Sequence, residues 1–131
     1  MGNKVLGFDL RKVASPIIRS GDEDTTTASI IETMLEAEDE INQVAISENA
    51  GQRDPTTYLA ACDDTGIVQV LEGIEKVPAA RKKSGKRVLV HSQDDTTLLS
   101  SCVFRPRSKK KELASAGTDC QVCLWDVSKP K

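Results

Sequence analysis

Residues 113–126 read Leu-Ala-Ser-Ala-Gly-Thr-Asp-Cys-Gln-Val-Cys-Leu-Trp-Asp, and residues 59–72 read Leu-Ala-Ala-Cys-Asp-Asp-Thr-Gly-Ile-Val-Gln-Val-Leu-Glu. The two stretches align without a gap: each opens on Leu-Ala and two small residues, crosses a polar turn and closes on alternating apolar residues before an acid. The apolar run before each also recurs, at residues 44–46 and 102–104, and residues 5–9 match the closing run alone. A repeated small β-unit is typical of solenoids, sandwiches and propellers.

Short apolar runs separated by turn residues continue along the rest of the chain. Residues 63–66, Asp-Asp-Thr-Gly, have the composition of a tight hairpin turn. Several such runs in succession predict antiparallel all-β structure. The expected strands lie at residues 4–9, 43–47, 58–62, 67–71, 88–91, 98–104, 113–116 and 121–125.

Residues 29–41 allow two interpretations. Ile30, Met34 and Ile41 form part of a helical stripe, and Ser29 with Glu32 has the form of a capping box, which favours a helix. The repeat instead assigns the first half of this segment to an edge strand. We expect the strand, because local propensity is a weak prior against tertiary context, and the helix stays the alternative.

The repeats resemble those of the WD-repeat β-propeller family. The resemblance rests on residues 112–119, on Val122-x-Leu124-Trp125-Asp126 after them and on residues 103–106 before them, and it is weakest over residues 22–35. It implies antiparallel blades of four strands, and about two and a quarter of them fit in this chain, which is fewer than a closed ring needs. The outer sheets would then need further repeats or partners to cover their faces.

This resemblance divides the chain into three expected parts. Residues 1–35 would be the end of one blade with an acidic loop, residues 36–91 a complete blade, and residues 92–131 three strands of the next blade.

The resemblance also implies a structural tetrad in the last repeat. WD repeats often hold a hydrogen-bonded set of His, Ser, Asp and Trp, and this sequence has His91, Ser115, Asp119 and Trp125 at the matching positions. A buried imidazole and a buried indole N–H need such partners.

The middle repeat departs from that set. It carries Ala61, Thr65 and Leu71 at three of the positions and has no His. We expect packing alone to hold this blade, which would make it the looser one.

Phe8-Asp9-Leu10-Arg11 resembles a second family feature. An apolar residue, an acid, any residue and Arg at the end of a closing strand are similar to the signature of propellers that dock on the adaptor of a cullin–RING ubiquitin ligase. The resemblance implies that Arg11 projects into the adaptor while Asp9 steers it through charge-assisted hydrogen bonds.

The cysteines invite a metal interpretation that the spacing does not support. Cys120 and Cys123 form a Cys-x-x-Cys pair, but positions i and i+3 of a strand point to opposite faces. With one His in the chain and Cys62 and Cys102 in other apolar runs, we expect four small buried hydrophobes and no metal site.

Catalytic signatures are not found in the sequence. A single His, without a Gly-x-Ser-x-Gly elbow or a glycine-rich phosphate loop, predicts neither an enzyme nor a cofactor site. No run approaches the roughly 18 apolar residues of a membrane helix, and no signal peptide opens the chain, so an intracellular protein of the cytoplasm or nucleus is expected.

Charge is distributed unevenly although the net charge is −2. Residues 22–40 hold eight acids and no Lys or Arg, whereas residues 81–87 and 105–111 are basic. The basic runs suggest a nucleic-acid or chromatin-associated protein as the alternative, but no aromatics that could stack on bases are interleaved with them. The sequence therefore favours a noncatalytic scaffold that binds proteins, and a nucleic-acid partner is not expected.

Overall fold

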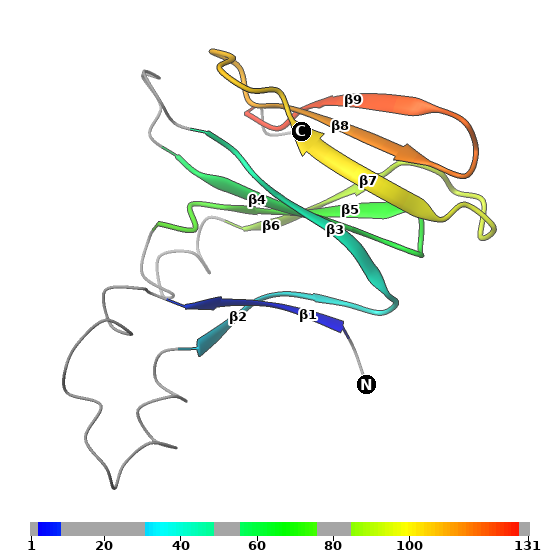
Figure 1. The fold of residues 1–131 in the computed structure, drawn as a ribbon, viewed down its shortest axis with the longest axis horizontal. Coiled ribbons are helices and arrows are strands. Elements are labelled where there is room, and N and C mark those ends of the chain that lie inside the picture. Colours follow the sequence, from blue (N-terminus) through cyan, green and yellow to red (C-terminus); the bar gives the residue numbers. More distant parts are fainter. Residues whose placement is uncertain (1–2, 9–30, 49–55, 76–84, 129–131) are drawn as a thin grey trace, which may run out of the picture.

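The computed structural model describes residues 3–8, 31–48, 56–75 and 85–128, and these residues form nine strands and no helix. All strand pairs are antiparallel, and each sheet follows chain order: β1-β2, β3-β4-β5-β6 and β7-β8-β9 (Figure 1). The strands are β1 (Asn3–Phe8), β2 (Ile31–Ala37), β3 (Ile41–Ile46), β4 (Tyr58–Asp63), β5 (Ile67–Glu72), β6 (Lys86–Val90), β7 (Leu99–Phe104), β8 (Glu112–Gly117) and β9 (Val122–Asp126). The expected all-β class is confirmed, and the sheets are consistent with one full propeller blade between two partial ones.

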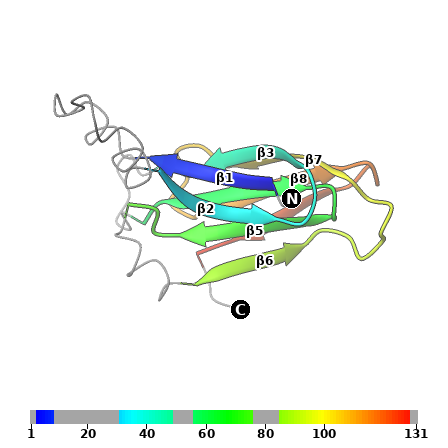
Figure 2. The same ribbon diagram turned by 90° about the horizontal axis from the view of Figure 1, so that it is seen from below.

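The three sheets lie in layers, with the four-stranded sheet in the middle (Figure 1). One apolar cluster joins the middle sheet to β7–β9, through residues such as Val68, Val70 and Leu99. A smaller cluster joins it to β1–β2, through Leu35 and Leu59. Figure 2 shows β6 lying beyond the edge of the two-stranded sheet.

β4 occupies the centre of this arrangement. All six of its residues are buried, because alternate side chains enter the two clusters on opposite faces. Burial on both faces explains why residues 58–62 read as a continuous apolar run.

The segment with two interpretations is a strand where the structure describes it. β2 pairs with β1, with Val5 opposite Leu35, and the side chains of Leu35 and Ala37 are buried. Ser29 and Ile30 lie outside the described residues. The pairing with β1, which the local pattern does not encode, overrides the helical stripe, and β2 runs past residue 35 to Ala37.

Side chains of β3 connect the middle sheet to β7. The Asn42 side-chain amide donates to the Leu99 carbonyl at 2.8 Å. The carbonyl oxygen of the Gln43 side chain accepts from the Ser101 hydroxyl at 2.6 Å and from the Cys102 backbone N–H at 3.3 Å. These two residues satisfy backbone groups of the neighbouring sheet and so fix the alignment of the two sheets.

The outer face of the third sheet is apolar and uncovered in the part of the chain that is described. Val103, Val122 and Leu124 are 54%, 69% and 79% exposed.

In the described residues, no helix has the length and apolar character needed to cross a membrane.

Candidate functional site

The structure brings together the four residues that the sequence singled out as a tetrad. His91 follows β6, Ser115 lies in β8, Asp119 lies in the turn after β8, and Trp125 lies in β9. His91 Nδ1 is 2.7 Å from Ser115 Oγ, and Nε2 is 3.2 Å from Asp119 Oδ2. Trp125 Nε1 donates to Ser115 Oγ at 2.9 Å.

One assignment of hydrogens satisfies every member of this network. The indole N–H can only donate, so Ser115 Oγ accepts from Trp125 and its own hydroxyl donates to His91 Nδ1. The imidazole then carries its proton on Nε2 and donates it to the Asp119 carboxylate. Each polar atom has a partner of the right kind, which stabilises the buried network.

The network joins two sheets and shields the imidazole from solvent. His91 follows the last strand of the middle sheet, whereas its partners belong to the third sheet, and the His91 side chain is fully buried. Cys123 Sγ lies 4.0 Å from Nε2. The geometry is that of a structural connection between successive sheets.

A comparison with known proteins agrees with this geometry. The chain is 31% identical over 93 residues to the WD repeat-containing protein 53 homolog of Dictyostelium discoideum. The chain is similar to the WD-repeat β-propeller family. The match covers 71% of this chain and 21% of that relative, so the chain spans about a fifth of the relative's length. No family model matches, and no solved structure matches significantly.

The middle repeat is packed without the tetrad. Ala61 and Leu71 occupy the columns of Ser115 and Trp125, and both contribute to the cluster against β1–β2. Thr65 occupies the column of Asp119, and its backbone N–H donates to Asp63 Oδ1 at 3.0 Å within the turn. Apolar contact replaces the hydrogen-bonded set in this repeat.

The cysteines differ from the expectation of four buried thiols. Cys62 and Cys102 are buried, but Cys120 is exposed and Cys123 is half-buried. Cys120 lies before β9, with a left-handed φ of 61°, so the alternation rule for strands does not apply to it. The described residues contain no group of three His, Cys, Asp or Glu side chains arranged to hold a metal ion.

The two buried thiols contact each other across the sheets. A hydrogen bond with Cys62 raises the pKa of the Cys102 thiol, and burial raises it further. Cys102 stays protonated and behaves as the small hydrophobe that its apolar run predicts.

Some basic residues of the described runs make structural contacts, whereas Arg107, Lys109 and Lys110 are exposed. Arg105 pairs with Glu112 at 2.9 Å, and Arg87 pairs with Glu72 at 3.3 Å. Lys111 is 4% exposed, and its ammonium donates to the Glu48 carbonyl at 2.7 Å, which joins the third sheet to the segment after β3. These contacts do not favour the nucleic-acid interpretation, while residues 76–84 lie outside the described part.

The Asp-x-Arg motif lies at the edge of what the structure describes. The backbone of Phe8 ends β1, whereas Asp9 and Arg11 lie outside the described residues. The structure thus places the strand that precedes the motif, and the motif itself stays a prediction.

Sequence reasoning missed Gln69. This residue lies in the middle of β5 and is 5% exposed, and its side-chain oxygen has no hydrogen-bond partner among the described residues. The signal was an amide at a central position of the apolar run Ile-Val-Gln-Val-Leu, where a polar side chain needs a partner.

Proposed function

We propose that the chain is a noncatalytic scaffold that binds protein partners. The similarity to a WD-repeat protein carries this proposal, because WD repeats generally serve as interaction platforms. The stacked sheets support it, because hydrogen bonds that involve the side chains of Asn42, Gln43 and His91 join neighbouring sheets and fix their relative positions.

The sharper proposal is that the protein is a substrate receptor of a cullin–RING ubiquitin ligase in the cytoplasm or nucleus. Phe8, Asp9 and Arg11 would contact the ligase adaptor. The motif follows directly on a strand that pairs in a sheet, and the end of such a strand is a fixed point from which a side chain can reach a partner. A guanidinium offers the planar, multidentate donors that a protein acceptor site recognises.

Co-precipitation of the adaptor with the full chain tests this role. We expect Arg11→Asp to lower the recovered adaptor at least about tenfold, because it replaces the donor with a like charge beside Asp9. Arg19→Asp makes the same change of charge outside the motif and should leave recovery unchanged. Equal recovery with Arg11→Asp and the unmodified chain would exclude the docking role and leave the broader scaffold proposal standing.

A further inference from the structure

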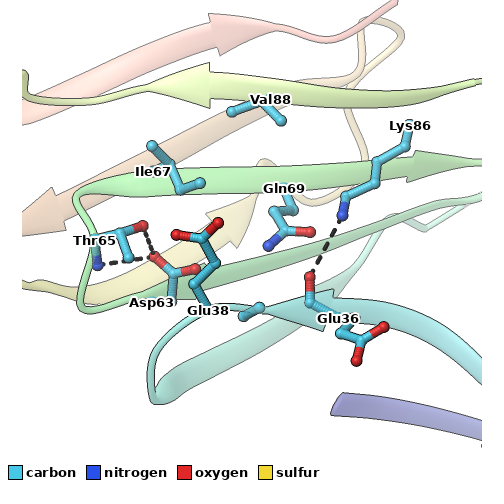
Figure 3. Close-up of a pocket in the computed structure, with 9 residues that line it drawn as sticks. Glu36, Glu38, Asp63, Thr65, Ile67, Gln69, Lys86 and Val88 are labelled. Atoms are coloured by element: carbon cyan, nitrogen blue, oxygen red, sulfur yellow. Dashed lines mark hydrogen bonds between the residues drawn. The ribbon is translucent and has the colours of Figure 1, made fainter. Parts of the chain in front are cut away.

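A groove of about 790 Å³ opens between β2 and the face formed by β5 and β6 (Figure 3). Gln69 forms part of its wall, as do the apolar side chains of Ile67 and Val88. Three carboxylic acids line it as well: Glu36 and Glu38 from β2 and its end, and Asp63 from the end of β4. Its volume lies within the range of sites that hold small ligands or short peptide segments.

Gln69 supplies a buried acceptor in this groove. Alternation along β5 directs Val68 and Val70 into the cluster against the third sheet and directs Gln69 toward the first sheet. Figure 3 shows its carboxamide facing the space between β5 and β2. The side-chain oxygen has no partner among the described residues. A buried acceptor without a donor is costly, so a ligand that brings an N–H to this oxygen is favoured.

The charge of the groove favours a cationic ligand. Lys4 pairs with the Glu36 carboxylate at 3.5 Å, whereas no ion pair with a described residue engages Glu38 or Asp63. Lys86 directs its ammonium to the Glu36 backbone carbonyl at 3.4 Å (Figure 3), so the one basic side chain among the described lining residues forms no ion pair with Glu38. The lining therefore carries excess negative charge beside an unpartnered acceptor.

The chemistry of these groups selects among cations. The described residues show no cluster suited to a metal ion. The groups that line the groove suit an organic cation instead. A guanidinium has five N–H donors in one plane and can serve a carboxamide oxygen and a carboxylate together. Its apolar stem matches the walls formed by Ile67 and Val88.

We propose that this groove binds an arginine side chain presented by a protein partner. The guanidinium pairs with Glu38 and donates to Gln69 Oε1, which is buried in the unbound chain and reaches the groove when the carboxamide turns about the end of its side chain. The proposal rests on the scaffold function and names one of its binding sites, separate from the Asp9–Arg11 motif.

Titration of the isotope-labelled full chain with the capped peptide Ac-Ala-Ala-Arg-Ala-Ala-amide tests the proposal by NMR. We expect saturable shifts of the Gln69 side-chain amide and of backbone amides near Glu38 and Val88, with a Kd of about 1 mM or lower. The peptide with citrulline in place of arginine keeps the shape and loses the charge, and it should bind at least about tenfold more weakly. The proposal would be overturned if the Gln69 side-chain amide did not shift at up to about 10 mM peptide. Equal binding of the arginine peptide, its citrulline form and a matching lysine peptide would overturn it too.

Three variants distinguish specific binding in the groove from nonspecific attraction of the peptide to acidic side chains. Gln69→Met keeps the side-chain length and removes the acceptor, and Glu38→Gln removes the charge at an exposed position that does not threaten folding. Each should weaken arginine-peptide binding about tenfold. Glu40→Gln changes a neighbouring exposed acid that does not line the groove and should bind as the unmodified chain does. Equal weakening of binding by all three variants would contradict the assignment. No weakening by any of them would contradict it as well, and this is the result expected if only water occupies the groove. The adaptor experiment is independent of either result.

Discussion

Ser115 shows how much depends on one small side chain. Its hydroxyl is buried between the Trp125 indole and the His91 imidazole and satisfies both. The imidazole has no water as a ready substitute, because Ser115 is 2% exposed and the His91 side chain is fully buried. The Ser115 side chain therefore contributes more to the stability of the fold than its size indicates.

We predict that Ser115→Ala lowers the free energy of unfolding by about 3 kcal/mol, since it removes two hydrogen bonds and leaves buried polar groups unsatisfied. Urea denaturation of the full chain measures this loss. Ser100→Ala, an exposed serine of β7 with a long hydrogen bond to the Ala116 carbonyl, should change it by less than about 0.5 kcal/mol. Equal losses for the two variants would show that the network does not stabilise the fold.

At the scale of elements, the β4–β5 turn positions the segment that carries His91. Gly66 has a φ of 77°, and its carbonyl accepts the backbone N–H of His91 at 3.1 Å and that of Ser92 at 3.3 Å. A Cβ at Gly66 would lie 3.2 Å from the Ser92 carbonyl oxygen and 3.3 Å from that of Thr97. Both the backbone conformation and the crowding disfavour a side chain at this position.

We predict that Gly66→Ala destabilises the chain more than Gly85→Ala does. Gly85 also has a positive φ, 86°, but a Cβ there would meet nothing within 4 Å. Gly85→Ala should cost about 1 kcal/mol from backbone strain, and Gly66→Ala at least about 1 kcal/mol more from contact with the two carbonyls. Thermal unfolding of both variants measures the difference; equal midpoints would mean that the turn does not pack against the segment after β6.

At the scale of the whole molecule, we expect the position of a sheet in the stack to decide how well its amides are protected from hydrogen exchange. β4 is buried on both faces, whereas β2 buries Leu35 and Ala37 and exposes Thr33 and Glu36. The absence of a tetrad in the middle repeat predicts a looser blade, but its central location argues for the opposite, because apolar contact on both faces must be lost before it opens.

Hydrogen exchange separates these two expectations. We predict that amides of β4 and β5 exchange at least about tenfold more slowly than those of β1 and β2 at pH 7. Mass spectrometry of the full chain, with peptides that cover each strand, measures the rates, and β8 serves as the internal reference from a tetrad-bearing sheet. Exchange in β4 as fast as in β1 would support the looser middle blade.

The resemblance to WD repeats implied the four residues of the tetrad, and the sequence by itself determined the succession of short strands and the hairpin within each repeat. Two aligned copies of Leu-Ala-small-small followed by a turn carry that information locally, since hairpin pairing depends on neighbouring residues. The tertiary structure decided what local pattern cannot encode: that residues 31–37 pair with β1 as a strand, that Cys120 lies exposed in a turn, and that Gln69 faces a groove between two sheets. These outcomes depend on which surfaces meet when the sheets stack, and such contacts join residues distant in the sequence, so their energies leave no periodic pattern in any one segment.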